Sequence, residues 1–371
     1  MPKGKLKKVF PGGNTARGFY SFYDYIIEPD AARIFVIKGG PGVGKSTFMR
    51  KIGEEMLSRG YDTEFHLCSS DNASLDGVVF PSLRVAIIDG TAPHIVDPKN
   101  PGAVDKIIHL GDYWNEQGLK AHKKEILNLN QEIARLFRRA YSYLFAANLF
   151  LEEVRSYYKE TGALSVGGFD RVVLALVHEV FTGKPRQTDS PKIRHLFGTA
   201  NTPDGTISYL DTIVNHLKKR YIINGDDGTG KTTLVRRIME AAQMRGFDVE
   251  AYHCALNPDR IEHLVIPRLD IAVVNSVEPH YYKPQNGDTV VDTMAWVIEL
   301  ANETIATERN MARQMYRRCM EEATEFLSRA KKTHDEIEAY YVLNMDFTAI
   351  EARRQQVLRE ILKLTGKIDE K

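Results

Sequence analysis

Two glycine-rich stretches carry residue types that bind polyphosphates. Each fits the spacing GxxxxGK[ST], in which glycines let the backbone wrap an anion and the loop N–H groups point at it. The lysine is expected to bridge the β- and γ-phosphates, and the next hydroxyl to ligate Mg²⁺. The residues expected to hold this ligand are Gly39, Gly40, Pro41, Gly42, Val43, Gly44, Lys45, Ser46 and Thr47, and then Gly225, Asp226, Asp227, Gly228, Thr229, Gly230, Lys231, Thr232 and Thr233.

An aspartate ends an apolar run in the first half of the chain. The run 85–88 leads into Asp89, and ligands bind at the carboxyl ends of strands in open α/β sheets. We therefore expect Ser46 and Asp89 to hold Mg²⁺, although a plain strand-ending aspartate has the same pattern. Thr232 is the matching metal ligand in the second half, but Asn275 replaces the aspartate there. Because an amide supplies no negative charge, the first site is the better candidate for turnover.

Three further residues are candidates for work on the γ-phosphate. No glutamate adjoins Asp89, so Asp76 is the candidate general base that activates water. His94 and His280 each begin the pattern His-x-x-x-Pro-x-Asn, a short distance after a predicted strand. An imidazole at that position is suited to contact phosphate or orient water. A structural histidine hydrogen-bonded to the loop backbone explains the same pattern.

Other polar residues have two interpretations each. Asn14-Thr15 and Asn201-Thr202 follow the first predicted strand of each half, and they suit either a γ-phosphate sensor or a turn cap. Arg138-Arg139 and Arg317-Arg318 suit either arginine fingers or a solvated helix face.

The sequence contains an internal repeat. Lys45 and Lys231 lie 186 positions apart, and this offset continues without a gap to His94 and His280, with 16 of the 50 positions identical. An internal repeat of this length predicts two homologous domains. We place them at 1–185 and 190–371, joined by a Pro-, Ser- and Thr-containing linker.

Each half is predicted to contain an α/β core and a helical part. The cores are placed at about 1–112 and 194–294, and the helical parts at about 115–183 and 295–365, from the change in periodicity. Strands and helices alternate in each core, which predicts a mainly parallel sheet. The segments expected are strands at 8–10, 33–37, 63–67 and 85–88, helices at 19–28 and 45–59, and their counterparts at 195–197, 220–223, 249–253, 271–274, 206–219 and 231–245.

A long apolar stripe marks the helical part of each half. Apolar residues step by three or four from Ile126 to Tyr158 and again from Ala312 to Tyr341. Each stripe predicts one face of a helix of about 30 residues, roughly 45–50 Å long. Two packings fit this pattern, on the helix's own domain or on the other long helix, and the sequence does not say which helix faces which.

Composition narrows the class of protein. Among 371 residues, Lys and Arg number 50 and Asp and Glu 49, which argues against a polybasic nucleic-acid binder. No apolar run approaches the ~18 residues of a membrane span, and the basic start has no apolar segment typical of a secretory signal. Cys68, Cys254 and Cys319 lack metal-like spacing, so we expect a reducing, cytoplasmic location.

With two such loops, each between a predicted strand and a predicted helix, the sequence resembles P-loop NTPases over the α/β core of both halves. It also resembles a group of bacterial tandem P-loop proteins described only as ATPases. The resemblance implies binding of ATP or GTP with Mg²⁺ and no defined pathway. Gly40 and Asp226 stand where one variant of the loop has a second lysine, so the chain departs from the partitioning-ATPase type.

Three functions remain open at this point. The first is Mg²⁺-dependent hydrolysis of a nucleoside triphosphate, with ATP favoured because Pro203 stands where a guanine-reading element would need lysine. The second is a P-loop kinase that transfers the γ-phosphate to a small molecule, and the third a non-catalytic, nucleotide-gated switch or scaffold. The long helices suit an unknown protein partner, whereas nucleic acid and membrane are not expected.

Overall fold

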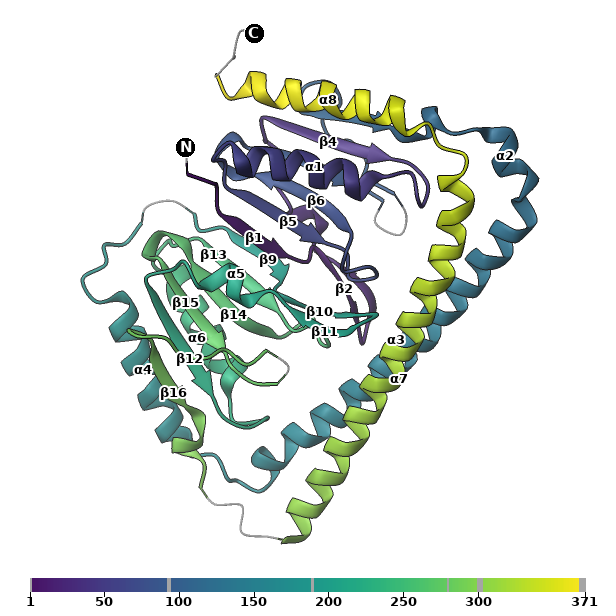
Figure 1. Cartoon of the computed structure of the whole chain (residues 1–371). Coiled ribbons are helices and arrows are strands. Elements are labelled where there is room, and N and C mark those ends of the chain that lie inside the picture. Colours follow the sequence, from purple (N-terminus) through teal and green to yellow (C-terminus); the bar gives the residue numbers. More distant parts are fainter. Residues whose placement is uncertain (1, 92–94, 188–189, 279, 299–302, 367–371) are drawn as a thin grey trace. The chain divides into compact units, whose positions relative to one another are not determined.

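The computed structural model describes residues 2–91, 95–187, 190–278, 280–298 and 303–366. The chain is an α/β protein with two similar mixed six-stranded sheets, each followed by helices (Figure 1). The predicted α/β class with mostly parallel sheets is therefore confirmed. Contacts divide the chain into two compact units. Unit 1 comprises Met1–Gly13, Ser21–Arg139 and Glu325–Lys371, and unit 2 comprises Asn14–Tyr20 and Ala140–Thr324.

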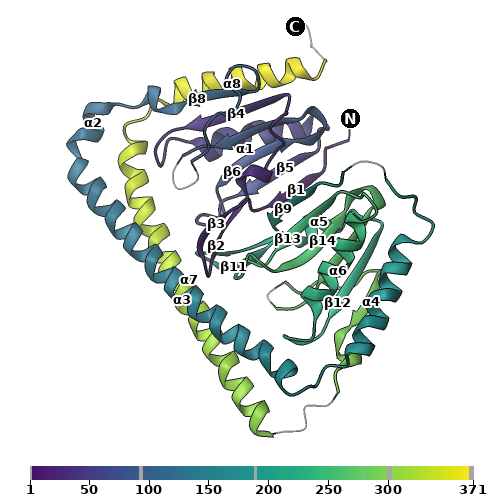
Figure 2. The ribbon, with the colours of Figure 1, turned by 180° about the vertical axis from the view of Figure 1, so that it is seen from behind.

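The sheet of unit 1 has the strand order β1-β5-β6-β7-β4-β8. Figure 2 labels β8, β4, β6, β5 and β1 of this sheet. Its strand β6 runs antiparallel to both neighbours, and the other pairs are parallel. Helix α1 (Lys45–Ser58) packs on β5 and β6, and helix α8 (Phe347–Leu364) packs on α1. The strands are β1 (Leu6–Val9), β5 (Thr63–Leu67), β6 (Leu75–Phe80), β7 (Val85–Asp89), β4 (Arg33–Lys38) and β8 (Asp105–His109).

The sheet of unit 2 repeats this order and these directions. Its order is β9-β13-β14-β15-β12-β16, with β14 antiparallel to both neighbours. Helix α6 (Lys231–Gln243) packs on β14, and helix α4 (Val166–Phe181) packs on α6. The strands are β9 (Ile193–Phe197), β13 (Val249–His253), β14 (Ile261–Ile266), β15 (Ile271–Asn275), β12 (Lys219–Asn224) and β16 (Thr289–Asp292).

The predicted helix at 19–28 is wrong, and only a short part of the one predicted at 206–219 is helical. Each half instead has a short antiparallel hairpin, β2 (Gly12–Thr15) with β3 (Gly18–Ser21) and β10 (Thr199–Thr202) with β11 (Gly205–Ser208). Gly18 and Gly205 have φ of 84° and 93°, the left-handed region that glycine enters without steric cost. Only the 3₁₀ turn η1 (Tyr23–Tyr25) and the short helix α5 (Leu210–Val214) follow the hairpins.

Two asparagines from the hairpins form a reciprocal pair inside unit 2. The Asn14 side-chain amide donates to the Asn201 carbonyl (3.1 Å), and that of Asn201 donates to the Asn14 carbonyl (2.9 Å). The Tyr141 hydroxyl also donates to Asn14 Oδ1 (3.1 Å). Both asparagines are buried. Both side-chain amides donate to backbone carbonyls of the opposite hairpin. We therefore assign this pair a structural role and do not propose it as a phosphate sensor.

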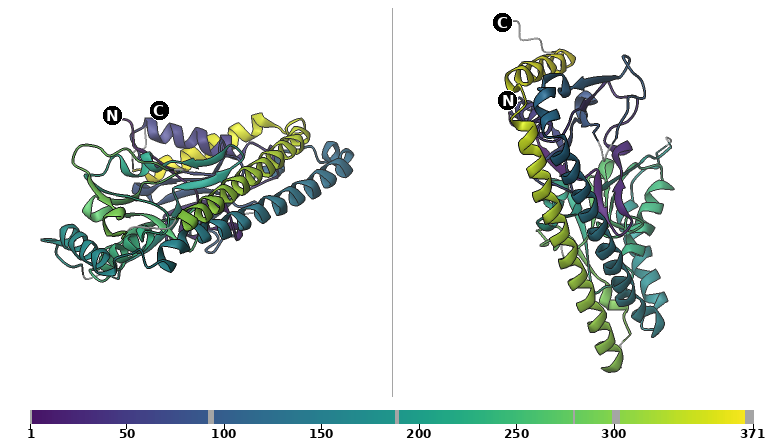
Figure 3. Two further views of the ribbon diagram at one scale, coloured as in Figure 1. Left: turned by 90° about the horizontal axis from the view of Figure 1, so that it is seen from below. Right: turned by 90° about the vertical axis from the view of Figure 1, so that its right-hand side faces the viewer.

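Helices α3 (Lys123–Glu160) and α7 (Glu303–Val342) each take part in both units. Within each unit, a segment of α3 lies beside a segment of α7 (Figures 1 and 3). In unit 2, Leu144, Ala147 and Leu151 of α3 pack with Cys319 and Ala323 of α7. No helix in the described ranges is both long enough and apolar enough to cross a membrane.

The compact units are not the two halves of the sequence repeat. Helix α8 lies near the end of the chain but packs on α1, and α4 belongs to the first half but packs on α6 of the second. Lys106 of β8 and Glu360 of α8 are joined by an ion pair of 2.7 Å. Each α/β core is therefore covered by helices from the other half of the sequence.

We predict that Asn14→Ala destabilises the protein. The change removes the hydrogen bond to the buried Asn201 carbonyl, and a buried acceptor without a partner costs about 1–3 kcal/mol. Chemical denaturation should show this loss in the free energy of unfolding. Asn130→Ala, at an exposed position of α3, is the control and should change it by less than about 0.5 kcal/mol. Equal small effects of both substitutions would contradict the structural role.

Candidate functional site

The first glycine-rich loop (39–44) joins β4 to α1 in unit 1. Gly42 and Gly44 have φ of 65° and 83°, so the loop uses a backbone conformation that side chains disfavour. The Lys45 ammonium donates to the Gly40 carbonyl (2.7 Å) and the Gly39 carbonyl (3.2 Å). The lysine thus lies across the loop, at the amino-terminal end of α1, where anions are favoured.

Asp89 lies beside this lysine. Strand β7 is parallel to β4, with Asp89 opposite Ile37, so both strands deliver residues to one edge of the sheet. Asp89 Oδ2 is 3.6 Å from Lys45 Nζ. Burial raises the pKa of Asp89, while the charge of Lys45 opposes that rise. The Ser46 hydroxyl, at the start of the same helix, accepts the Leu75 N–H (3.0 Å).

Asp76 joins the same group of residues. It lies at a bulge of β6, a strand that the sequence did not predict, where the pairing with β5 shifts by one residue. Its side chain is buried. Burial raises the pKa of Asp76 to about 6, against hydrogen bonds from Tyr23 and Cys68 and the charge of Lys45. A carboxyl group that changes protonation near neutral pH thus lies next to the loop lysine.

The end of α7 and the start of α8 cover the first loop closely. A Cβ atom at Gly42 would lie 2.8 Å from the Glu338 carbonyl oxygen, and one at Gly40 would lie 2.6 Å from the Tyr341 ring. Such contacts are too short for real Cβ atoms. The glycines are therefore required by packing against the helix as well as by any anion.

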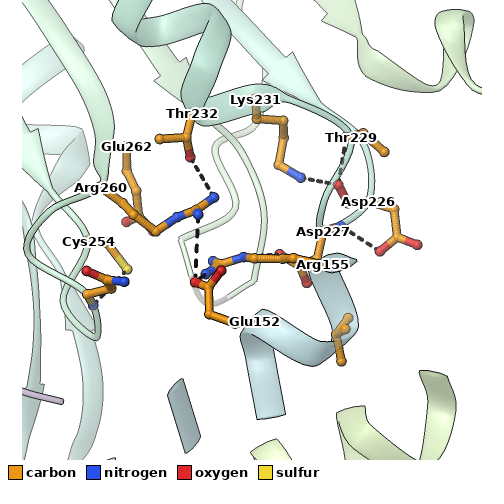
Figure 4. Close-up of polar contacts among 12 residues, drawn as sticks. Glu152, Arg155, Asp226, Asp227, Thr229, Lys231, Thr232, Cys254, Arg260 and Glu262 are labelled. Carbon is orange, nitrogen blue, oxygen red and sulfur yellow. Dashed lines mark hydrogen bonds and ion pairs between the residues drawn. The ribbon is translucent and has the colours of Figure 1, made fainter. Parts of the chain in front are cut away.

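The second glycine-rich loop (225–230) joins β12 to α6 in unit 2. The Lys231 ammonium donates to the Gly225 carbonyl (2.9 Å) and also to the Asp226 carbonyl, as Lys45 does in its own loop (Figure 4). A Cβ at Gly228 would lie 2.5 Å from the Arg155 carbonyl oxygen of α3. The two loops therefore share the lysine geometry and the close helix.

The second loop differs in charge. Asp226 is ion-paired with Arg309 (2.6 Å) and Arg313 (2.8 Å) of α7, and Tyr158 donates to it (3.1 Å). Burial would raise the pKa of Asp226, but the hydrogen bond and charge of Arg309, with Arg313, lower it overall. This carboxylate is therefore ionised at neutral pH and held by two guanidinium groups.

A guanidinium group contacts the hydroxyl predicted to ligate Mg²⁺ in the second half. Arg260 donates to Thr232 Oγ1 (3.2 Å), and Arg155 and Arg260 are linked through Glu152 (Figure 4). Burial, with the charges of Arg155 and Arg260, lowers the pKa of Lys231 to about 8. The aligned residue of Arg260 in the first half is Ser74. A divalent cation at Thr232 would be repelled by this arginine.

Two residues of unit 2 occupy the positions that match the acidic pair of unit 1. Glu262 aligns with Asp76 and Asn275 with Asp89, and both are buried. His263 and His280 lie with them, with ring centroids 4.8 Å apart. Burial and the neighbouring His280 lower the pKa of His263 well below its usual value. The first-half candidate His94 lies outside the described residues.

The remaining predicted ligand residues divide by burial. Val43 and Thr229 are buried within their loops, whereas Thr47 and Thr233 are exposed on the first turns of α1 and α6. Arg138 and Arg139 are exposed, and Arg317 pairs with exposed Glu278 at 3.3 Å. Arg317 also lines a cavity beside the second loop.

Sequence reasoning missed the cations of the second loop, which are Arg155, Arg260, Arg309 and Arg313. Comparison of the halves held a signal for two of them, because Arg155 aligns with Glu338 and Arg260 with Ser74. Charge differences between otherwise matching positions mark places where the two sites have diverged.

A cavity of about 830 Å³ borders the second loop within unit 2. Asp226 and Asp227 line one side, Tyr281 belongs to the segment after β15, and Arg313 and Tyr316 come from α7. Its volume is within the ~300–1,000 Å³ usual for small-molecule sites. The loop therefore opens onto space for more than a phosphate group.

Comparison with known protein families, curated proteins and solved structures finds no match to this chain.

We predict that Gly228→Ala is more damaging than Gly205→Ala. Both glycines have similar φ, 91° and 93°, so both variants carry the ~1–3 kcal/mol cost of a left-handed non-glycine residue. Only the Gly228 variant also meets the α3 backbone, whereas nothing lies within 4 Å of a Cβ at Gly205. Thermal unfolding should show the larger loss for Gly228→Ala. Equal losses would mean that α3 does not pack on the loop.

We predict that Asp76→Asn changes stability in a pH-dependent way. The folded-state pKa is raised from 3.8 to about 6, so the protonated carboxyl favours the native state below pH 4. That contribution is lost as pH rises through 6, by up to roughly 3 kcal/mol. Relative to wild type, the variant should therefore gain free energy of unfolding between pH 4 and pH 8.

Denaturation curves across this pH range measure the effect. Asp97→Asn, which changes an exposed carboxyl of the same unit, is the control and should differ from wild type by less than about 0.5 kcal/mol throughout. A stability difference for Asp76→Asn that is constant with pH would contradict the raised pKa.

Proposed function

We propose that the first glycine-rich loop binds a nucleoside triphosphate with Mg²⁺, as in P-loop NTPases, and that its γ-phosphate is hydrolysed there. One observation carries this proposal. The Lys45 ammonium and the Asp89 carboxylate are 3.6 Å apart, at the edge where β4 and β7 end and α1 begins. A cation for phosphate and an anion for a metal thus meet where backbone N–H groups favour anions.

The residues present suit Mg²⁺ in chemical type. Ser46 and Asp89 offer a hydroxyl and a carboxylate oxygen, the hard ligands that Mg²⁺ prefers alongside water and phosphate. When bound, Mg²⁺ neutralises charge on the phosphates and polarises them. Lys45 and the loop N–H groups would hold the phosphates against the loop, so that the γ-phosphate is oriented for attack by water.

Asp76 is our candidate for the general base. A base works best with a pKa near the working pH, and burial brings the pKa of Asp76 to about 6. Ionised Asp76 would take the proton of the attacking water. Hydrogen bonds from Tyr23 and Cys68 to this carboxyl would orient it.

We propose that the second loop binds nucleotide with little turnover. Asn275 brings no charge for a metal, and Arg260 already donates to Thr232 (3.2 Å). Arg155, from the first half of the sequence, lies beside this loop with its Nε 3.9 Å from Asp227. Nucleotide at this loop would therefore act on α3, and exposed Phe145 and Leu149 of α3 suit contact with a protein partner.

Transfer of the γ-phosphate to a small molecule is the second candidate function. The cavity of about 830 Å³ beside the second loop favours it, and this alternative requires turnover at that loop in place of the little turnover proposed above. Tyr281, Tyr316 and Lys283 line this cavity, so it offers aromatic surface and a cation to an acceptor. Such a reaction needs an acceptor and would release little free phosphate without one.

ATP is the nucleotide we propose. The segment Asn201–Asp204 lacks the lysine of a guanine-reading element, because Pro203 stands there. The Asn201 amide also donates to the carbonyls of Asn14 (2.9 Å) and Ala255 (3.0 Å). This segment is therefore engaged in the hairpin packing of unit 2.

We predict that Lys45→Ala lowers the rate of phosphate release from Mg-ATP by at least about 100-fold, the usual loss when one transition-state contact is removed. Lys231→Ala is the matched variant, because Lys231 makes the same loop contacts, and it should cost much less. Release of free phosphate by purified protein, without an added acceptor, measures both rates. Phosphate release from GTP in the same assay tests whether the protein prefers adenine to guanine.

Three other results would count against the proposal. Equal losses in both variants would contradict unequal sites. Tight nucleotide binding without phosphate release in wild type would exclude hydrolysis and favour the switch. Conversion of ATP to ADP only when a small acceptor is present, with the γ-phosphate recovered on that acceptor, would favour the kinase.

A further inference from the structure

A bulge in β14 brings two potential metal ligands to one place in unit 2. Tyr252 pairs with His263 but His253 pairs with Ile261, so Glu262 has no residue opposite it. Bulges of this kind re-aim side chains that would otherwise alternate across the sheet. Asn275 ends the neighbouring strand β15, and His280 follows in the next loop.

The group contains buried polar atoms without hydrogen-bond partners among the described residues. They are His263 Nε2, His280 Nδ1 and Nε2, and Asn275 Oδ1. The exposed fractions of these three residues are 1%, 5% and 4%. Most buried polar atoms in proteins have a partner, so four in one cluster need an explanation. A bound cation would supply the missing partner for several of them at once.

The geometry suits such a cation. Glu262, His263 and His280 each place one ligand atom within 4.8 Å of the others, and His280 Nε2 is 3.6 Å from Glu262 Oε2. Bonds of about 2.0–2.2 Å at tetrahedral angles would put ligand atoms roughly 3.3–3.6 Å apart. Small side-chain rotations therefore bring all three atoms to bonding distance of one ion.

We propose that Glu262, His263 and His280 bind a divalent transition-metal ion of the zinc type, with Asn275 Oδ1 as a further oxygen donor. Imidazole nitrogens favour zinc, copper, nickel or iron, whereas carboxylate, carbonyl and water oxygens favour magnesium. Two imidazoles and one carboxylate are a common ligand set for zinc.

The described positions of unit 1 that match this cluster hold two carboxylates and a glycine, and His94, the counterpart of His280, lies outside the described residues. Glu262 corresponds to Asp76, Asn275 to Asp89, and His263 to Gly77. The first half therefore presents two carboxylates near its lysine, and the second presents one carboxylate and imidazoles. At the matching positions that the structure describes, the first half suits a hard cation and the second half a softer one.

One hydrogen bond opposes metal binding. The Asn275 backbone N–H donates to His263 Nδ1 (3.2 Å), which places the proton of a neutral ring on Nε2. A metal bound at Nε2 would move that proton to Nδ1, and a metal bound at Nδ1 would compete with the Asn275 N–H. In both cases this hydrogen bond must break. The loss of one such bond weakens affinity by roughly tenfold. Binding should accordingly be measurable but weaker than at a preformed structural zinc site.

The test is direct metal binding to the metal-free full chain in nucleotide-free buffer. We expect one Zn²⁺ per chain, bound in the presence of excess Mg²⁺, and one Co²⁺ with the visible absorption of a low-coordinate site. His263→Ala with His280→Ala should abolish both signals, and Glu262→Gln, which keeps the side-chain volume, should weaken Zn²⁺ at least about 10-fold. His195→Gln is the control, because His195 already pairs with His253 (2.8 Å), and it should bind as wild type does.

Either of two results would overturn the site. The first is no Zn²⁺ or Co²⁺ bound by wild type, and the second is unchanged binding in Glu262→Gln, which remains decisive if the double histidine variant does not fold. Lys45→Ala and Lys231→Ala should bind Zn²⁺ as wild type does. The zinc site and the proposed nucleotide chemistry can therefore be disproved independently of each other.

Discussion

The close approach of a helix backbone to each glycine-rich loop is the constraint on which the candidate sites depend. The Glu338 carbonyl of α7 leaves no room for a Cβ at Gly42, and the Arg155 carbonyl of α3 leaves none at Gly228. Each helix comes from the half of the sequence that does not supply the loop. Neither half on its own would therefore build the surroundings of its loop, which gives a physical reason for the two halves to stay in one chain.

The same architecture carries two different charge patterns. In unit 1, the buried Asp76 and the half-buried Asp89 lie near Lys45, and desolvation raises the pKa of both carboxyl groups. In unit 2, the loop's own Asp226 is neutralised by arginines, a guanidinium contacts Thr232, and histidines join Glu262. Similar backbones thus hold an acidic group suited to a hard cation and a group rich in arginine and histidine. The proposal of unequal sites rests on this contrast.

Local sequence signals predicted the loops, their lysines and the strand that ends at Asp89. The antiparallel strands β6 and β14 escaped prediction because their central position in the sheet depends on pairing that no local pattern encodes. The helices predicted at 19–28 and 206–219 overlap the second strand of each hairpin, although Gly18 and Gly205 mark the turns. Contacts between segments far apart in the chain place α8 on the first core and α4 on the second. Such contacts also bring Arg155 and Arg309 to the second loop. The burial that perturbs Asp76 likewise appears only once the sheet is assembled.

The central claim is that one loop of the two binds Mg-nucleotide through Asp89. The most direct measurement is the number of nucleotide sites per chain whose affinity depends on Mg²⁺, determined by calorimetric titration with a slowly hydrolysed ATP analogue. We expect one such site in wild type, with its Mg²⁺ dependence lost in Asp89→Asn and retained in Asn275→Ala. Two equal Mg²⁺-dependent sites, or a dependence that survives Asp89→Asn, would contradict the claim.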